Sequence, residues 1–155
     1  MTHKIAIAGA SGRMGQMLMD AVRAADDCVL SGALDMAGSP AIGTDAGASS
    51  GQPTGVVIAS DLRQGLKDSQ VLIDFTRPEG TLAHLKVCRE LGVNAVIGTT
   101  GFTDAQKAEI AEAAKDIAIM MAPNMSVGVN VTLKLLEMAA KAMATWSTVV
   151  ACAQR

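Results

Sequence analysis

The sequence has almost no aromatic residues: tyrosine is absent, and aromatic residues make up 2% of its 155 residues. Aromatic side chains are the platforms on which proteins stack unpaired nucleic-acid bases. The chain also lacks a basic run, and its net charge is −2. It therefore lacks the positive surface that attracts phosphate backbones and anionic membranes. We expect neither a nucleic-acid partner nor a membrane partner.

Cysteine is scarce as well. Cys28, Cys88 and Cys152 are odd in number and far apart, without the C-x-x-C spacing typical of metal and redox sites. We expect reduced, mostly buried thiols, no metal site and a cytoplasmic location. No basic and then apolar leader precedes the first predicted strand, so a signal peptide is not expected.

Long apolar runs are also missing. The longest uncharged run, residues 117–133, is interrupted by Pro123, Asn124 and Asn130, which argues against a membrane-spanning helix. What the sequence has in abundance is small and aliphatic side chains: half of it is apolar, with ten methionines. A chain of this length suits one domain, whose core would consist of Ala, Val, Ile, Leu and Met.

The most informative stretch is residues 5–15, IAIAGASGRMG. A short apolar run ends at three glycines, and a helical pattern of apolar residues follows. Strand, glycine turn and helix in this order are typical of a phosphate-binding unit, because the first N–H groups of the helix point at the anion. The spacing is G-x-x-G-x-x-G rather than the stricter G-x-G-x-x-G, so a plain glycine-rich turn remains the alternative.

A second signal is Asp35, which ends a predicted buried strand at residues 28–35 and lies 20 positions after Gly15. In dinucleotide-binding folds, a carboxylate at this place accepts hydrogen bonds from the adenosine ribose. The alternative is a solvent-exposed carboxylate at a strand end. Asp35 favours a ribose 2′-hydroxyl over a 2′-phosphate, and Met36 follows it instead of an arginine, so we expect NADH to be preferred over NADPH.

Strand and helix patterns alternate through the rest of the chain. After a predicted surface loop at residues 37–55, strands are expected at 56–59, 71–76, 93–97 and 117–122, and helices at 61–66, 78–91, 103–115 and 127–144. The strands are continuous apolar runs, which predicts an α/β fold: a Rossmann-like, doubly wound parallel sheet with helices on both faces. Ligands bind at the carboxyl ends of such strands, where residues 98–100 and 122–125 also lie.

Three further features carry weaker signals. His84 lies in a predicted helix, and we interpret it as a surface or hydrogen-bonded residue rather than a catalyst. In the helix at 127–144, Lys134, Glu137 and Lys141 form one polar stripe, and the remaining apolar surface calls for burial. The last ten residues have β propensity at Val149 and Val150.

Four motifs in this order resemble bacterial dihydrodipicolinate reductase: the glycine turn, DFTRPEGT at residues 74–81, GTTGF at 98–102 and NMSVGVN at 124–130. The resemblance covers residues 1 to about 145. It implies a nicotinamide-dependent reductase of lysine and diaminopimelate synthesis, which transfers a hydride to a small dihydrodipicolinate-type substrate and gives tetrahydrodipicolinate. It also implies a homo-oligomer, a tetramer in the full-length family.

The resemblance assigns roles to residues of this chain. The pyrophosphate would lie on the glycine turn and the adenosine ribose at Asp35. The nicotinamide would lie beside residues 98–100, and residues 122–125 would lie at the hinge between domains, beside the nicotinamide ribose. Phe75, Thr76 and Arg77 would lie near the cofactor, which is NADH or NADPH. The implied cofactor-binding residues are Gly9, Ala10, Ser11, Gly12, Arg13, Met14, Asp35, Gly98, Thr99, Thr100, Ala122, Pro123, Asn124 and Met125.

The chain departs from the family after Thr145, where it reads WSTVVACAQR. The family's second domain carries a His-His-x-His-Lys cluster that supplies the proton and binds the substrate, and this cluster is absent from the sequence. We therefore expect a dinucleotide-binding domain at 1–125. Residues 126–155 would contain a hinge, the first helix of an otherwise missing substrate domain and an atypical tail, as in a truncated or frame-shifted chain.

Two functions follow from that departure. The chain is either the cofactor-binding part of a reductase, binding cofactor without turnover and with no catalytic residue of its own, or a non-catalytic dinucleotide-binding or sensing module. A short-chain dehydrogenase is excluded because its Tyr-x-x-x-Lys pair needs a tyrosine. A P-loop nucleotidase is excluded because no Gly-Lys-Ser/Thr follows the glycines.

Overall fold

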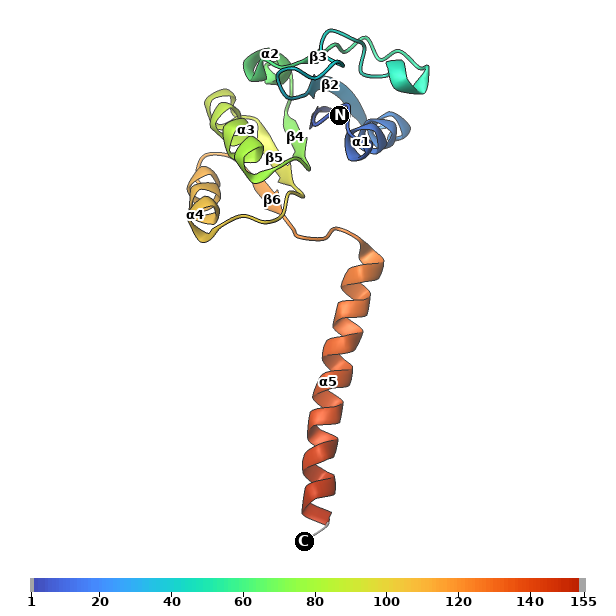
Figure 1. Ribbon diagram of the computed structural model, residues 1–155, viewed down its shortest axis with the longest axis vertical. Helices are drawn as coiled ribbons and strands as arrows, with labels where there is room; N and C mark the ends of the chain where they lie inside the picture. The colour runs from blue at the N-terminus through green and yellow to red at the C-terminus, as the bar shows by residue number, and fades with distance from the viewer. Residues whose placement is uncertain (1, 154–155) are drawn as a thin grey trace. The chain divides into compact units, whose positions relative to one another are not determined.

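The computed structural model describes residues 2–153 (Figure 1). Its backbone divides into two compact units, Met1–Pro123, which contains the sheet, and Asn124–Arg155, which contains the last helix. The elements, in chain order, are β1 (His3–Ala8), α1 (Arg13–Ala24), β2 (Cys28–Leu34), the 3-10 turn η1 (Ala48–Ser50), β3 (Ile58–Ala59), α2 (Leu62–Leu66), β4 (Val71–Asp74), α3 (Pro78–Leu91), β5 (Asn94–Ile97), α4 (Asp104–Ala113), β6 (Ile119–Met121) and α5 (Val127–Ala153).

The strands of the first unit form one parallel, six-stranded sheet with the order β3-β2-β1-β4-β5-β6. The chain moves outward from β1 to β3 and then returns to β4, on the other side of β1. The strand order therefore reverses between β1 and β4, and sheets of this kind bind ligands at the carboxyl ends beside that reversal. The predicted Rossmann-like α/β fold is confirmed.

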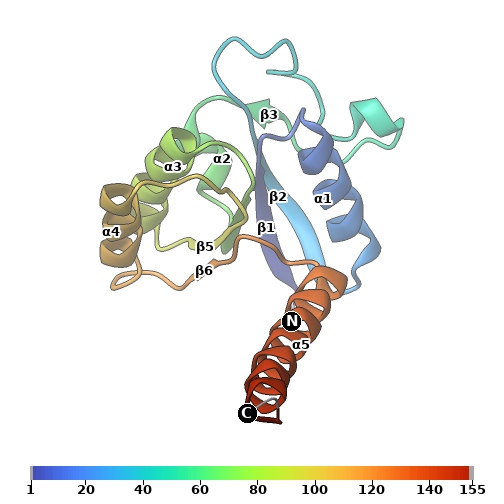
Figure 2. The same ribbon diagram turned by 60° about the horizontal axis from the view of Figure 1, so that its bottom comes forward.

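Helices lie on both faces of the sheet. Helix α1 covers one face, and α2, α3 and α4 cover the other (Figure 2). Because successive side chains of a strand point to opposite faces, β1 contributes to both hydrophobic layers. Its Ala6 and Ala8 pack with the layer of α3 and α4, and its Ile5 and Ile7 pack with the layer of α1.

Three helices of the first unit begin at residues that favour helix starts. Thr103 and Gln106 form a capping box at the start of α4, and Pro78 occupies the first turn of α3. Asp61 caps α2, where its carboxylate accepts the Gln64 N–H at 2.8 Å. Helix α4 ends at Ala113, two residues before the predicted end, because Ala114 already forms its C-cap.

One prediction about β structure is wrong. The strand predicted at residues 56–59 is reduced to β3, because Val56 and Val57 pair with the preceding loop instead. Val149 and Val150, for which the sequence indicated β propensity but no defined strand, lie in α5. Neither glycine nor proline follows Gly128 in that helix, and a β-branched residue costs a helix only roughly half a kcal/mol.

The loop at residues 37–55 is more ordered than its composition predicts. Asp45 accepts hydrogen bonds from the backbone N–H groups of Gly47 (2.7 Å), Thr54 (2.9 Å) and Gly55 (2.7 Å). These hydrogen bonds, the Thr54 and Gly47 amides foremost, hold the pKa of the Asp45 carboxyl below its ordinary value. One carboxylate thus closes the loop, and Ala46 is buried against the sheet.

The second unit consists of α5 and the residues that lead into it. Glu137 forms ion pairs with Lys134 (3.0 Å) and Lys141, which confirms the predicted polar stripe. The large apolar side chains of α5 are exposed: Val127, Val129, Val131, Leu133, Leu135, Leu136, Met138 and Met143. Among the described residues, no helix has the length and apolar character needed to cross a membrane.

The closed loop gives a prediction about Asp45. In Asp45→Ala, the three amides lose their acceptor, so their hydrogen exchange should accelerate about tenfold or more, since each such bond is worth about 1 kcal/mol or more. Amide exchange measured by mass spectrometry or NMR tests this for residues 47, 54 and 55. The exposed Asp26→Ala is the matched control. Unchanged protection in Asp45→Ala would show that other contacts close the loop.

Candidate functional site

The glycine turn lies at the carboxyl end of β1. Gly9 adopts a positive φ of 71°, which favours glycine, and the Ala10 N–H donates to the Leu34 carbonyl at 2.9 Å. Gly12 is the N-cap of α1, and no side chain caps this helix. The first turn of α1 also contains no acidic residue. Its amides and the positive end of its dipole are therefore available to an anion.

Gly15 lets α1 approach the turn closely. A Cβ atom added there would lie 2.2 Å from the Gly9 carbonyl oxygen and 2.9 Å from the Ala10 Cα. Both neighbours are backbone atoms, which cannot move away without displacing the turn. The last glycine of the motif is therefore required for helix packing, as expected for a phosphate-binding βα unit.

Asp35 meets this turn in space. One carboxylate oxygen accepts the Ser11 N–H at 3.0 Å, and the other accepts the Met36 N–H at 2.8 Å. Partial burial alone would raise the pKa of the Asp35 carboxyl, but hydrogen bonds from Ser11 and Met36 outweigh it and hold this pKa below the ordinary value. The two strongest sequence signals thus converge on one place, where the Asp35 carboxylate lies beside the glycine turn.

A cavity of about 580 Å³ opens beside them. It is lined by Gly9 and Asp35 together with Thr76 and Arg77, which the family resemblance implies to be near the cofactor. It also contains residues that the sequence analysis did not assign to the site: Leu34, Met36, Ala37, Ser60, Leu62, Glu79, Gly80, Ala83 and His84. Ser60 directly follows β3, so the rule of carboxyl strand ends could have identified it.

The carboxyl end of β4 carries a buried polar network around Asp74, which is 1% exposed. Its Oδ1 accepts the Thr76 N–H at 2.8 Å and the Thr76 hydroxyl at 2.6 Å, with the Thr99 hydroxyl at 3.5 Å. Its Oδ2 lies 2.7 Å from His84 Nδ1. His84 is thus a hydrogen-bonded residue, as expected, and it also borders the cavity.

Electrostatics around Asp74 follow from these contacts. Burial raises the pKa of this carboxyl, but the hydrogen bond and positive charge of His84, together with the Thr76 hydrogen bonds, outweigh burial and leave the pKa below its ordinary value. Burial, and then the Asp74 charge, raise the pKa of the Cys88 thiol to about 12. Cys88 therefore stays protonated. Cys28 and Cys88 are both free thiols, and the side chain of Cys152 lies outside the described residues.

The segment after β5 lies next to this network. The Gly98 N–H donates to the Asp74 carbonyl at 2.9 Å, and a Cβ added at Gly98 would lie 2.0 Å from the Phe75 ring. Thr99 is buried, and its hydroxyl receives a hydrogen bond from Thr81 at 3.0 Å. The Thr99 hydroxyl is therefore occupied inside the protein, and residues 98–100 do not line the cavity beside Asp35. Thr100 is exposed.

The last four residues assigned to the site fall in different units. Ala122 and Pro123 end the first unit, where the Ala122 N–H donates to the Ile97 carbonyl at 3.2 Å. Asn124 and Met125 belong to the second unit. There the Asn124 side chain accepts the Ser126 N–H at 2.8 Å, which orders the approach to α5.

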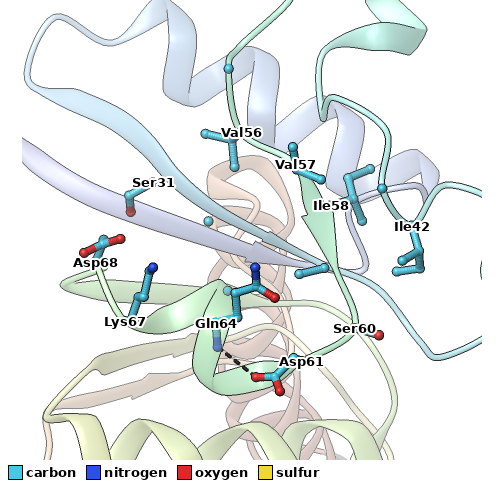
Figure 3. A pocket seen from close by; sticks show the side chains of 15 residues that line it. Ser31, Ile42, Val56, Val57, Ile58, Ser60, Asp61, Gln64, Lys67 and Asp68 are labelled. Carbon is cyan, nitrogen blue, oxygen red and sulfur yellow. Dashed lines mark hydrogen bonds between the residues drawn. The ribbon is translucent and has the colours of Figure 1, made fainter.

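A second cavity, of about 520 Å³, lies along β3 and α2 (Figure 3). Ser31, Lys67 and Asp68 line one end of it, and Asp61, with its hydrogen bond to Gln64, lies at the other. None of the residues assigned to the cofactor lines this cavity. Among the side chains that the structure describes, no group of three His, Cys, Asp or Glu residues could hold a metal ion.

The glycine turn supports a graded prediction. Gly15→Ala should lower the free energy of unfolding by about 1–3 kcal/mol, because the added methyl group overlaps the Gly9 carbonyl. Gly12→Ala is the matched control, since its Cβ would lie 3.2 Å from the same oxygen and should cost less. Urea titrations followed by circular dichroism test this. Equal losses in both variants would contradict the role of the close approach.

Comparisons with known proteins agree with this geometry. The family model described as dihydrodipicolinate reductase, N-terminus, matches residues 3–125. The chain is 66% identical over 138 residues to the 4-hydroxy-tetrahydrodipicolinate reductase of Herminiimonas arsenicoxydans, covering 89% of this chain and 52% of that one. It is 64% identical over 141 residues to the enzyme of the same name from Cupriavidus pinatubonensis, covering 91% and 53%.

A solved structure extends the likeness to three dimensions. The dipicolinate-bound dihydrodipicolinate reductase from Paenisporosarcina sp. TG-14 superimposes with a TM-score of 0.72 and 27% identity, covering 90% of this chain and 54% of that one. The chain thus spans about half the length of the curated relatives it matches. With the family model matching most of its residues, the chain belongs to the dihydrodipicolinate reductase family.

Proposed function

We propose that this chain is the part of a lysine- and diaminopimelate-pathway reductase that binds reduced nicotinamide dinucleotide. The observation that carries the proposal is the contact between Asp35 and the glycine turn, where the carboxylate accepts the Ser11 N–H at 3.0 Å. A ribose needs a carboxylate acceptor and a pyrophosphate needs free amides, and here Asp35 lies beside the start of α1, whose first-turn amides have no partner within the helix. The close packing of α1 on the turn at Gly15, where there is no room for a Cβ atom, supports the same ligand.

In this proposal each segment holds one part of the cofactor. Residues 9–14 hold the pyrophosphate, with the first-turn amides of α1 as the free donors, and Asp35 holds the adenosine ribose. Gly98–Thr100 border the nicotinamide, and Ala122–Met125 form the hinge between a dinucleotide-binding domain at 1–125 and residues 126–155. When bound, the dihydronicotinamide supplies a hydride to an unsaturated, dihydrodipicolinate-type ring. This chain's own residues bind and orient.

Cofactor preference follows from the surroundings of Asp35. Its carboxyl pKa is held below the ordinary value, so it is negatively charged at neutral pH and repels a 2′-phosphate. Met36 is 75% exposed and brings no compensating charge. We therefore propose that NADH binds more tightly than NADPH.

Substitution at Met36 tests this preference. Met36→Arg should tighten NADPH binding about tenfold and change NADH binding little, because an arginine can pair with the 2′-phosphate. Dissociation constants measured at low salt by titration calorimetry check it. Met17→Arg, on the exposed surface of α1, adds the same charge elsewhere and reports any general electrostatic effect. Tighter NADPH binding by the unsubstituted chain would refute the preference.

Turnover is a separate matter. The family's proton-donating His-His-x-His-Lys cluster does not occur in the 155 residues, and general acids contribute roughly 10²–10⁴-fold to rates. We propose that the chain alone binds cofactor without turnover. This same absence favours the second candidate, a non-catalytic dinucleotide-binding or sensing module.

An assay separates binding from catalysis. The purified chain should bind NADH and yet show no substrate-dependent loss of NADH absorbance, because the cluster that protonates the product in the family is not among these residues. The full-length relative from Herminiimonas arsenicoxydans serves as the positive control. Substrate-dependent NADH oxidation by the 155-residue chain would contradict the proposal.

Two further proposals concern assembly and location. The exposed apolar side chains of α5 support self-association, so we propose a homo-oligomer. The free thiols of Cys28 and Cys88 support a reducing compartment, and we propose the cytoplasm.

A further inference from the structure

We propose that the buried Asp74–His84 pair positions two backbone turns of the cofactor site. The first is the glycine turn after β1, and the second is the segment 98–100 after β5. The inference rests on the proposed dinucleotide site and adds residues to which the motifs assigned no role. It starts from the position of Asp74, which ends the central strand β4 between β1 and β5. From this position one carboxylate reaches the segments that follow two neighbouring strands.

The first turn is reached through Thr76. Both the backbone N–H and the hydroxyl of Thr76 donate to Asp74 Oδ1, which fixes the path of the chain after β4. The Thr76 methyl carbon in turn lies against the glycine turn, 3.2 Å from where a Cβ of Gly9 would be. The orientation of Asp74 therefore determines what borders Gly9.

The second turn is reached through Thr99. Its hydroxyl donates to Asp74 Oδ1 at 3.5 Å and accepts from Thr81 at 3.0 Å. Thr81 is fully buried in α3, so this chain of hydroxyl groups joins α3, the end of β4 and the segment 98–100. The long distance from Thr99 to Asp74 makes this the weakest link, and it depends on the carboxylate keeping its orientation.

His84 maintains that orientation. It is the described partner of Asp74 Oδ2, at 2.7 Å, and its side chain is 13% exposed. Without the imidazole, one oxygen of a buried carboxylate would lose its donor, which is costly inside a protein. The carboxylate would rotate or take up a proton, and Thr76 and Thr99 would lose their common acceptor.

The groups around the pair define its charge balance. On α3, the Cys88 thiol lies near enough for the Asp74 charge to raise its pKa, and the Thr81 hydroxyl donates to Thr99. On the strand-end segments, the hydroxyls of Thr76 and Thr99 donate to Asp74. The charged residues Arg77 and Glu79 border the same cavity as His84. The groups in direct contact with Asp74, apart from His84, are thus hydroxyls and a backbone amide.

The test uses three variants of His84 and its surroundings in the full chain. His84→Ala should weaken NADH binding about tenfold, because the donor to Asp74 is lost. His84→Asn should restore affinity to within about twofold, since its amide N–H can occupy the place of Nδ1. Lys86→Ala, on the exposed side of the same helix, should leave binding unchanged.

Amide exchange gives a readout that does not require cofactor. In His84→Ala, protection should fall at residues 98–101 and 9–12 and be retained in the β1 and β5 strands. His84→Asn should restore it. A structural role alone would lower protection throughout the sheet, and that result would overturn the proposal.

The other outcomes are also decisive. Unchanged binding and exchange in His84→Ala, or equal losses in His84→Ala and His84→Asn, would overturn the positioning role. Should His84→Ala fail to fold, Thr76→Val takes its place: it keeps the methyl group beside Gly9 but removes the 2.6 Å hydrogen bond, and unchanged binding would then overturn the inference. Failure of the unsubstituted chain to bind NADH refutes the proposed function, while the exchange data still test the pair.

Discussion

The absence of a side chain at Gly15 is the constraint on which the rest of the site depends. Because a Cβ there would overlap the Gly9 carbonyl, only glycine allows α1 to begin directly beside the end of β1. That approach aims the first amides of the helix over the carboxyl edge of the sheet. It also brings Ser11 within reach of Asp35. The features that we propose to bind the pyrophosphate and the ribose are thus consequences of one backbone contact.

Much of this arrangement could be predicted from local patterns. The capping box at Thr103, the proline that opens α3 and the glycine turn are each specified by residues within a few positions of one another. The parallel sheet follows from strands that are continuous apolar runs. Even the meeting of Asp35 with the turn could be expected, because the carboxyl ends of neighbouring parallel strands lie at the same edge.

What could not be predicted are contacts between residues on different elements. Asp74 meets His84 across 10 positions and Thr99 across 25, and no spacing rule connects a strand end to the side of a helix in this way. Asp45 likewise accepts hydrogen bonds from the amides of Thr54 and Gly55, which follow it by nine and ten residues. In both cases composition indicated only a polar residue, and the tertiary fold determined its partners.

The hydrogen bond from Ser11 to Asp35 also has a thermodynamic consequence. It orders the glycine turn and the end of β2 before any ligand arrives, so the loss of conformational entropy belongs to folding rather than to binding. A dinucleotide would exchange partners on groups that are already aligned instead of recruiting a disordered loop. Association at this end of the site should then proceed at the rate of a preformed pocket, without a slow conformational step.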